Sequence, residues 1–522
     1  MGSPVIGSLA IVLHAHLPWV RHPEQDRFLE EYWLFEAVAE CYLPLLGMFR
    51  GWDRDGVDWR LTLGLTPTLI AMWADPLLRS RIERYLKERC ELATLECNRT
   101  VLDPPLHRVA RFHEGFYRRS WQEWNACGGD LIGAFAAWAR TGRLELLGGP
   151  ATHPILPLLV GEPGSLRAQL RLGLREHERH FGHRPAGLWL PECAWSPALE
   201  PHLRGEGLGH CVLETHGLMK ASPPPPAAVF LPVRHPAGLT FFGRDPLSAR
   251  QVWSRQAGYP GDPRYREFHQ DLADEADWES VSRFLPGAGV RYPTGLKYHR
   301  VTGGLGEKLT YDRDLALEAV AEHATHFLAQ RRWQFEQAGA GLTRPPVLVA
   351  PYDAELFGHW WFEGPEFLDR VMRQAAAMDI RMDTLSGLAA APPLPWVSQP
   401  AESSWGAGGH LRVWLHPDNA DLQPRLRSAG ARMVAMTRRL LDSDHSVRPH
   451  LQETLRKAGR ELLLAQASDW PFLIRMGTAA QYARARAEGH LEAFDRATEA
   501  VLGLEQGLRS NVLCDSWPGE GF

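Results

Sequence analysis

The sequence predicts an α/β protein built around a parallel β-barrel, and two observations lead to this fold class. Seven short runs of aliphatic and β-branched residues recur through the first three-quarters of the chain, and helical patterns separate many of them. Strands that alternate with helices are typical of a parallel sheet, and this many strands favour closure into a barrel. A chain of 522 residues is long enough for a barrel and one or two further units.

The expected strands occupy residues 9–13, 60–65, 144–147, 187–190, 211–213, 239–242 and 347–350. Segments 34–48 and 168–181 have the apolar spacing of helices. The stretch from about 76 to 141 lacks a good strand and is predicted to be a mostly helical insertion.

Proline and small residues at 392–400 suggest a linker, and beyond about Leu422 apolar residues recur at helix-face spacing. We therefore expect a catalytic barrel domain over residues 1–395, which includes the insertion, and a helical C-terminal domain over residues 396–522.

The composition excludes several classes of protein. A net charge of −5 without a long basic block argues against a nucleic-acid partner. No apolar run reaches the roughly 18 residues that a membrane helix requires, and no leader pattern precedes the first strand. Seven scattered cysteines without a C-x-x-C pair argue against a disulfide framework, so a cytoplasmic protein is expected. Twenty tryptophans exceed what core packing alone would ask for.

Polar side chains follow each expected strand. They are His14 and His16, Thr66, His153, Glu192, Glu214 and His216, Arg244, and Asp353. Because a β/α barrel builds its active site at the carboxyl ends of its strands, these residues are candidates for one site.

The histidine pair leaves several interpretations open. His14 and His16 lie two residues apart in a strand and share one face, which suits a metal pair, contacts to a sugar, or hydrogen-bonded core histidines. A metal site would need a third ligand, and neither an H-E-x-x-H motif nor a cysteine cluster supplies one.

Two carboxylates have aromatic surroundings. Glu192 lies between Trp189 and Trp195, and Asp353 lies in the stretch P-Y-D-A-E-L-F-G-H-W-W at 351–361. Because desolvating an acid without purpose is costly, both residues are predicted to be functional. Glu355 is interpreted as a structural acid near a helix start. Trp360 and Trp361 cannot easily share one face, so one of them is predicted to lie in the core and the other in the wall of the site.

Two acids at strand ends, with aromatic rings nearby, indicate a carbohydrate site. Glycosidic bond cleavage uses one carboxylate as nucleophile or base and a second, protonated carboxyl as acid. Aromatic rings offer flat apolar faces that suit the C–H faces of pyranose rings.

Motifs along nearly the whole chain carry a family resemblance. They are H-A-H-L-P (14–18), L-G-L-T-P (63–67), A-T-H (151–153), W-L-P-E (189–192), Q-V-W-S with G-Y-P-G (251–261), Y-R-E-F-H (265–269), P-Y-D-A-E-L-F-G-H-W-W (351–361), S-W-G-A-G-G (404–409) and A-S-D-W-P-F-L (467–473). In these motifs and their order the chain resembles glycoside hydrolase family 57, and within it the 1,4-α-glucan branching enzymes.

The resemblance implies a distorted (β/α)7 barrel with a helical insertion and an all-helical C-terminal domain, without metal or cofactor. It implies a retaining mechanism on α-1,4-glucan with Glu192 as the nucleophile and Asp353 as the general acid/base. The substrate-binding positions that it implies are Arg244, Gly261, Trp405 and Asp469, and the positions that line the cleft are His14, His16, His153, Trp253 and Trp414. A monomer is favoured.

The chain departs from the family pattern in one loop. Branching enzymes of this family carry a long loop with a tyrosine at its tip, whereas residues 217–238 form a short, proline-rich stretch without tyrosine. Because a lid that excludes water favours transfer, hydrolysis could take a larger share of turnover here. Three hypotheses therefore remain: a branching transferase, an α-glucan hydrolase of the same family, and a non-catalytic glucan-binding protein.

Overall fold

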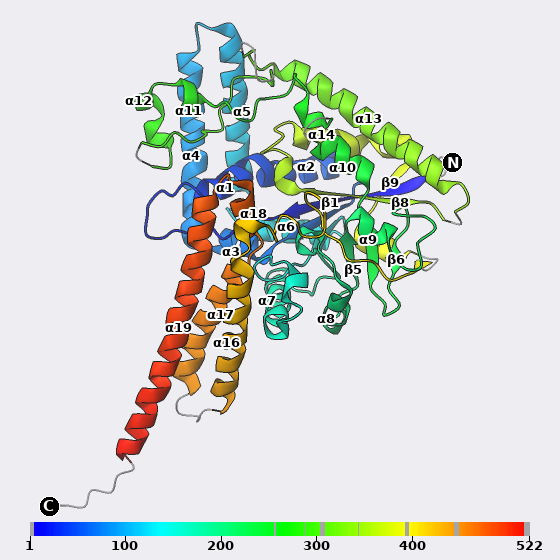
Figure 1. The fold of residues 1–522 in the computed structure, drawn as a ribbon. Helices are drawn as coiled ribbons and strands as arrows, with labels where there is room; N and C mark the ends of the chain where they lie inside the picture. Colours follow the sequence, from blue (N-terminus) through cyan, green and yellow to red (C-terminus); the bar gives the residue numbers. More distant parts are fainter. Residues whose placement is uncertain are drawn as a thin grey trace, which may run out of the picture. The chain divides into compact units, whose positions relative to one another are not determined.

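The structure is a computed structural model that describes residues 5–515, except 255–256, 288, 303–307, 343, 392–395 and 443–447 (Figure 1). The helices of its first half are α1 (Glu31–Ala37), α2 (Leu43–Arg54), α3 (Pro67–Ala74), α4 (Pro76–Arg99), α5 (Pro104–Ala126), α6 (Leu131–Arg140), α7 (Pro163–Phe181), α8 (Glu200–Gly205), α9 (Thr215–Met219) and α10 (Pro246–Trp253). Those that follow are α11 (Leu272–Glu275), α12 (Trp278–Val281), α13 (Arg313–Gly339), α14 (Gly364–Gln374), α15 (Leu385–Ala390), α16 (Leu422–Asp442), α17 (Arg448–Ala465), α18 (Asp469–Met476) and α19 (Ala480–Asp515).

Seven parallel strands close into a barrel. They are β1 (Gly7–Ala15), β2 (Leu61–Leu65), β3 (Leu144–Leu147), β4 (Gly187–Leu188), β5 (His210–Leu213), β7 (Thr240–Gly243) and β8 (Val347–Asp353). One sheet has the order β3-β2-β1-β8 and the other contains β7-β5-β4. Parallel bridges from Gly148 to Leu188 and from Arg244 to Val349 join the two sheets. All seven expected strands are present, and the distorted (β/α)7 barrel is confirmed.

The barrel core explains why these segments form strands. Every residue of β1 is buried, as is every residue of β2. A strand covered on both faces needs a continuous apolar run rather than an alternating one, and this is the pattern of 9–13 in the sequence. Two additional strands extend the second sheet: β6 (Val233–Arg234) pairs antiparallel with β7, and β10 (Trp396–Val397) pairs with β6. A further strand, β9 (Ile380–Met382), pairs with the start of β1.

The expected insertion at 76–141 is helical, and consists of α4, α5 and α6. Aspartates begin these helices: the side chain of Asp75 accepts from the backbone N–H groups of Leu77 and Leu78, both at 3.0 Å. Proline at the first helical position and an aspartate cap just before it favour a helix start. Helices α4 and α5 lie side by side at the top of Figure 1.

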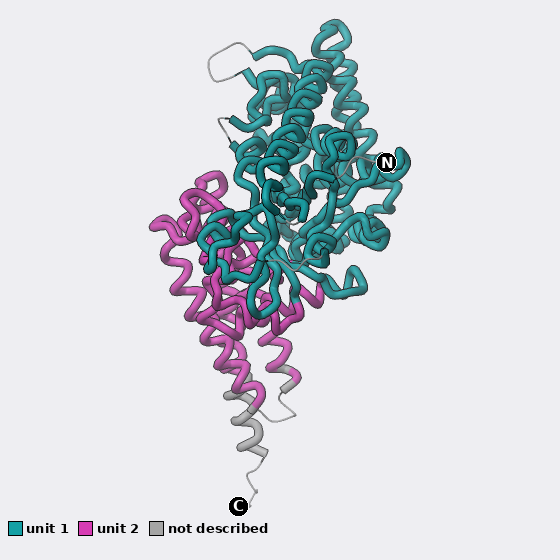
Figure 2. The backbone as a smooth tube through the Cα atoms, turned by 90° about the vertical axis from the view of Figure 1, so that its right-hand side faces the viewer, with its two compact units in different colours: residues 1–148, 177–189, 208–400 teal, residues 149–176, 190–207, 401–522 magenta. Residues whose placement is uncertain are grey.

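The chain divides into two compact units, coloured separately in Figure 2. Unit 1 comprises Met1–Gly148, His177–Trp189 and Leu208–Pro400, and unit 2 comprises Gly149–Glu176, Leu190–Gly207 and Ala401–Phe522. Helices α16 to α19 belong to unit 2, which confirms the helical C-terminal region. The expected boundary between residues 395 and 396 stays a prediction.

The apolar positions of the C-terminal helices form the core of unit 2. Leu462 of α17 packs with Leu491 and Phe494 of α19 in one hydrophobic cluster. This packing agrees with the helix-face spacing of apolar residues that the sequence shows beyond about Leu422.

The linker expected at 392–400 is wrong for residues 396–399. Trp396 and Val397 form β10, and Gln399 pairs with Ser222 in an antiparallel bridge. Residues 392–395 lie outside the described residues. The proline-rich composition could not reveal this pairing, because the partner strand lies more than 150 residues earlier in the chain.

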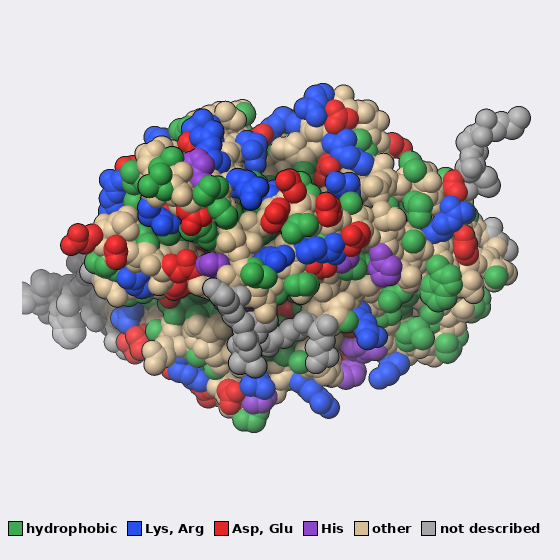
Figure 3. Space-filling view, turned by 90° about the horizontal axis from the view of Figure 1, so that it is seen from above, with side chains coloured by type: hydrophobic (Ala, Val, Ile, Leu, Met, Phe, Trp, Pro, Cys, Tyr) green, Lys and Arg blue, Asp and Glu red, His purple; other side chains and the backbone are tan. Residues whose placement is uncertain are grey.

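The helices and the surface agree with the composition. Within the described part of the chain, no helix combines the length and the apolar character needed to cross a bilayer. On the face shown in Figure 3, lysine and arginine side chains are interspersed with aspartate and glutamate.

Candidate active site

Unit 1 places two sequence-predicted residues, His14 and Asp353, at the carboxyl end of the barrel. His14 of β1 is in register with Gly64 of β2 and with Asp353, the last residue of β8. Residues in register on neighbouring parallel strands point to the same face of the sheet. The His14 ring stacks on Trp189, which follows β4, with centroids 4.5 Å apart. Because β1 and β4 are not neighbours in the sheet order, this contact crosses the barrel interior.

The interior position of His14 depends on a glycine. A Cβ at Gly64 would lie 3.4 Å from Nδ1 of His14 and 3.5 Å from Cβ of Trp189. Burial, and to a smaller extent the neighbouring His16, holds the pKa of His14 well below 6.5. The His14 imidazole is therefore neutral at pH 7 and can both donate and accept hydrogen bonds.

His16 is positioned by a buried acid that was predicted to be structural. The backbone N–H of His16 donates to Oε1 of Glu355 at 3.0 Å, and its Nδ1 lies 3.1 Å from Oγ1 of Thr66. The hydroxyl of Tyr42 donates to the same Glu355 oxygen. Glu355 thus ties the ends of β1 and β8 together, two residues beyond Asp353.

We predict that Glu355→Gln changes the pH dependence of stability. Burial raises the pKa of Glu355 from 4.5 to about 7, despite hydrogen bonds from Tyr42 and from backbone N–H groups that lower it. The native carboxyl therefore keeps its proton up to about pH 7, whereas the unfolded one loses it near 4.5. The stability contributed by this group is present below pH 4.5 and is lost as the pH rises through 7, a loss of about 3 kcal/mol.

The measurement is denaturant unfolding of both proteins at pH 5 and pH 8. From pH 5 to pH 8, the free energy of unfolding of wild type should fall by about 3 kcal/mol more than that of Glu355→Gln. The matched control is Glu492→Gln on α19, where the wild-type side chain is 67% exposed, and it should behave like wild type. Equal pH dependence in wild type and Glu355→Gln would contradict a buried, protonated Glu355.

Arg244 lies at the end of β7, as the strand pattern predicted. Its Nη1 donates to Oε2 of Glu214 at 3.0 Å, and both side chains are largely buried. Glu214 follows β5 and caps α9 by accepting from the N–H of Thr215. This ion pair fixes the guanidinium of Arg244 beside the strand ends.

The aromatic residues after β8 divide into core and surface. Trp361 is 2% exposed and packs on Phe367, whereas Trp360 is 45% exposed. The prediction that one of the pair lies in the core is confirmed. Trp253, the last residue of α10, packs against Trp360 at a centroid distance of 6.3 Å. Gly261 is exposed at the end of a 3-10 turn, and a Cβ there would contact no atom.

Glu192 belongs to unit 2, in a 3-10 turn from Pro191 to Cys193. Its backbone is left-handed, with φ 59° and ψ 25°, and Cys193 also has a positive φ of 47°. Non-glycine residues rarely adopt this conformation, and such strain concentrates at functional sites. The unusual backbone independently supports a functional Glu192.

The Glu192 carboxylate lies among donors within unit 2. The indole N–H of Trp405 donates to Oε2, and the hydroxyl of Ser468 donates to Oε1 at 3.3 Å. Nδ1 of His153 lies 3.9 Å from Oε1 and 2.9 Å from the Ser468 hydroxyl oxygen. Donors to a carboxylate favour its ionised form.

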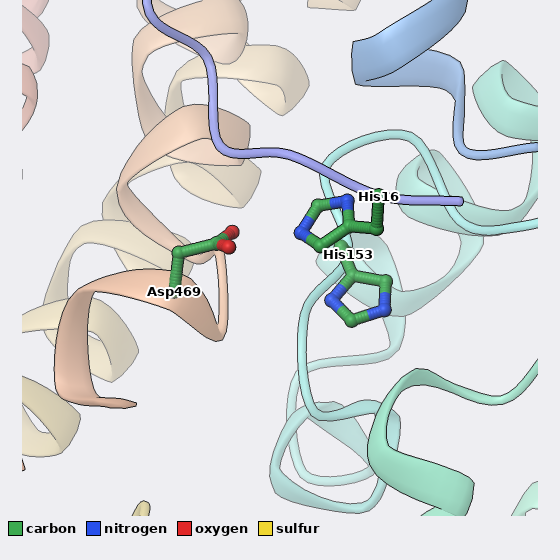
Figure 4. A group of neighbouring side chains, drawn as sticks. All are labelled: His16, His153 and Asp469. Carbon is green, nitrogen blue, oxygen red and sulfur yellow. The ribbon is translucent and has the colours of Figure 1, made fainter. Parts of the chain in front are cut away.

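Two further predicted residues, Asp469 and Trp414, belong to unit 2. Asp469 lies near His153, and Trp414 lies in a buried cluster. Asp469 begins α18, and a carboxylate oxygen of Asp469 lies within 4.8 Å of a ring nitrogen of His153; Figure 4 shows both side chains, as well as His16 at the end of β1. Trp414 is 1% exposed and clusters with Ile155 and Val413. The role of Trp414 in lining the cleft stays a prediction.

The sequence reasoning missed Ser468, Tyr42 and the role of Glu214. Ser468 stands in the A-S-D-W-P-F-L motif, and Glu214 follows a strand, so a signal existed for both. Tyr42 lies in a π-helical segment, Val38–Tyr42, where nothing in the local pattern marks it.

The chain is similar to known proteins over most of its length. A family model described as glycosyl hydrolase family 57 matches residues 10–386, and one described as 1,4-alpha-glucan branching enzyme, C-terminal, matches residues 425–514. The chain is 32% identical to a 1,4-alpha-glucan branching enzyme of Thermococcus kodakarensis, over 96% of this chain and 75% of that protein.

Two solved structures are also similar. The crystal structure of the alpha-amylase AmyC from Thermotoga maritima is 37% identical, with a TM-score of 0.88 over 95% of this chain and 93% of that one. The crystal structure of a branching enzyme from Pyrococcus horikoshii is 33% identical, with a TM-score of 0.84 over 95% of this chain and 90% of that one.

Proposed function

Because the chain belongs to glycosyl hydrolase family 57, we propose that it is a 1,4-alpha-glucan branching enzyme. It cleaves α-1,4 linkages in a glycogen-like glucan and transfers the released chain to a 6-hydroxyl, which forms an α-1,6 branch. The observation that carries this proposal is the match of the C-terminal region to the branching-enzyme model, in addition to the barrel match.

The proposed reaction is a double displacement with retention. Glu192 attacks the anomeric carbon while the protonated carboxyl of Asp353 gives its proton to the departing glycosidic oxygen. Asp353, now ionised, then takes the proton of the acceptor hydroxyl as that oxygen displaces Glu192. A retaining pair needs carboxyl groups about 5–5.5 Å apart, and this separation stays a prediction.

The surroundings of Glu192 support its role as the nucleophile. A nucleophilic carboxylate must be ionised, and the donors from Trp405 and Ser468 stabilise that form. Both donors come from the part of the chain after residue 400, so the C-terminal region orients the nucleophile. This is a physical reason for such an enzyme to retain its helical region.

The remaining predicted residues are proposed to bind glucan. Arg244 is fixed by Glu214 and can hold a sugar hydroxyl from the strand ends. Trp253 and Trp405 offer aromatic surfaces, and His14, His16, His153 and Asp469 offer hydrogen-bonding groups. Gly261 and Trp414 complete the proposed set. The absence of a metal requirement is part of the proposal.

The loop at 217–238 supports a second candidate function, α-glucan hydrolysis. Ser222 and Gln399 exchange backbone hydrogen bonds of 3.0 and 2.9 Å, and Ser398 Oγ donates to the carbonyl of Pro223 at 2.5 Å. The loop is therefore pinned along residues 398–399, which limits how far it can fold over a ligand. Similarity to an alpha-amylase agrees with a hydrolytic component.

The experiment is incubation with amylose in the presence of EDTA. Three quantities are measured: the iodine absorbance, the number of reducing ends, and the number of α-1,6 linkages, counted as the chains that a debranching enzyme releases. We expect α-1,6 linkages to form, together with more reducing ends per branch than a family member with a tyrosine-bearing loop produces. A difference of about 1.4 kcal/mol between the transfer and hydrolysis barriers changes this ratio tenfold.

Grafting a longer tyrosine-bearing loop at 217–238 should shift turnover toward branching. Reducing ends without any branches would identify a hydrolase instead. Activity that appears only when zinc is added would contradict a metal-free site, and transfer with negligible hydrolysis in the unmodified protein would contradict the role given to the loop.

The cellular compartment of the enzyme is proposed from its cysteines. Cys41, Cys90, Cys97, Cys127 and Cys211 are thiols that form no disulfide, which suits a reducing compartment and a cytoplasmic protein. We also propose that the protein is a monomer. The boundary between its two domains is proposed to lie near residue 395.

A further inference from the structure

A strip of rings follows β8 on the surface of unit 1. It consists of Trp360, His359 and Phe268, with Trp253 beside it. The centroid distances are 6.3 Å from Trp253 to Trp360, 6.5 Å from Trp360 to His359 and 5.8 Å from His359 to Phe268. Trp360 is 45% exposed and Phe268 is 36% exposed. Large aromatic side chains exposed side by side indicate a binding surface.

Buried charges hold this ring strip in place. Nδ1 of His359 lies 2.8 Å from Oε2 of Glu40, which is 3% exposed. Nζ of Lys297, which is 4% exposed, donates to the carbonyl of Phe268 and lies 4.4 Å from the centroid of the Phe268 ring. Burying an acid and an amine is costly. Here each buried charge fixes a residue that carries a ring to the surface.

The loop beneath Trp360 is equally constrained. Trp361 is inserted in the core, and its N–H donates to the carbonyl of Leu356 at 2.8 Å. A Cβ at Gly358, whose φ is +120°, would lie 1.8 Å from the carbonyl oxygen of Glu40, so only glycine fits this turn. The rings are therefore held in place before a ligand arrives, which reduces the entropy lost on binding.

The position of the ring strip identifies the part of the substrate that it meets. The N–H of Trp360 donates to the carbonyl of Glu355 at 3.2 Å, two residues from Asp353. In a retaining transferase the acid/base acts on the oxygen of the leaving chain and then on the hydroxyl of the acceptor. Because this hydrogen bond anchors Trp360 to the segment that follows Asp353, we assign the ring strip to the leaving and accepting chains.

We propose that the ring strip formed by Trp360, His359 and Phe268 binds the acceptor α-glucan chain. This inference rests on the proposed function and on the acid/base role of Asp353. The rings stack on the C–H faces of successive glucose units and present the acceptor hydroxyl to Asp353. The imidazole of His359, held by Glu40, contributes a hydrogen bond to a sugar hydroxyl.

The test separates donor cleavage from acceptor capture. An α-maltooligosyl fluoride serves as donor, and amylose labelled at its reducing end serves as acceptor. Fluoride release measures donor cleavage, and labelled product of increased length measures transfer. For Trp360→Ala we expect the apparent KM for the acceptor to rise about tenfold, with fluoride release in the absence of acceptor unchanged. Phe268→Ala should raise the same KM, and Trp360→Phe should restore most of the affinity.

The matched control is Trp333→Ala on α13, which removes another exposed tryptophan (54% exposed) and should leave both quantities unchanged. An unchanged acceptor KM in Trp360→Ala, with transfer intact, would overturn the acceptor proposal alone. Equal losses of fluoride release and transfer would also overturn it. If wild type releases fluoride but never lengthens the labelled acceptor, the proposed branching function fails instead.

Discussion

Replacing Glu192 by glutamine should lower the rate of glucan transfer at least about a thousandfold, because the amide cannot form the covalent glycosyl-enzyme. Glutamine has nearly the same size, and its carbonyl oxygen can still accept from the indole N–H of Trp405, while its amide N–H can donate to the hydroxyl oxygen of Ser468. The fold should therefore persist, which circular dichroism checks. The measurement is the rate of α-1,6 linkage formation from amylose.

Azide provides a sharper readout with a shortened side chain. With an α-maltooligosyl fluoride and azide, Glu192→Ala should form the β-glycosyl azide, since the anion attacks from the face that the removed carboxylate occupied. The matched control is Glu402→Gln, a change in the same unit at a residue whose side chain accepts from Ser196 at 3.1 Å, and it should keep transfer activity. Near-normal transfer in Glu192→Gln would remove Glu192 from the mechanism.

Replacing Asp353 by asparagine should lower transfer from amylose by about 10²- to 10⁴-fold, because the leaving oxygen then departs without a proton. Fluoride leaves without protonation, so fluoride release from an α-maltooligosyl fluoride should fall much less in its first turnover. The glycosyl-enzyme on Glu192 should then accumulate, since no base activates the acceptor hydroxyl. The measurements are amylose transfer and burst-phase fluoride release.

Azide again identifies the role. It needs no general base, so it should restore turnover of Asp353→Asn and yield the α-glycosyl azide, with retained configuration. Glu355→Gln, two residues along the same loop, serves as a comparison, and azide should not accelerate it. Equal losses with amylose and fluoride, without azide rescue, would show that Asp353 does not act as the acid/base.

Much of the fold follows from local patterns in the sequence. The seven barrel strands could be predicted because a strand covered on both faces is a short continuous apolar run, and this signal requires no knowledge of its partners. The C-terminal helices could be predicted for a similar reason, since residues such as Leu462 and Phe494 repeat at the spacing of one helix face. Glu192, Asp353 and Arg244 were candidates because polar residues directly follow these strands.

Other features depend on contacts between distant residues, and only the tertiary structure decided them. The donors to Glu192 come from Trp405 and Ser468, more than 200 residues later in the chain. Its positive φ, the pairing of β10 with β6, and the carboxyl of Glu355 shared by His16 and Tyr42 leave no local pattern. The choice of Trp361 for the core and Trp360 for the surface follows from the turn at Gly358. Local sequence reports which face of an element is apolar, whereas long-range packing determines which polar groups meet.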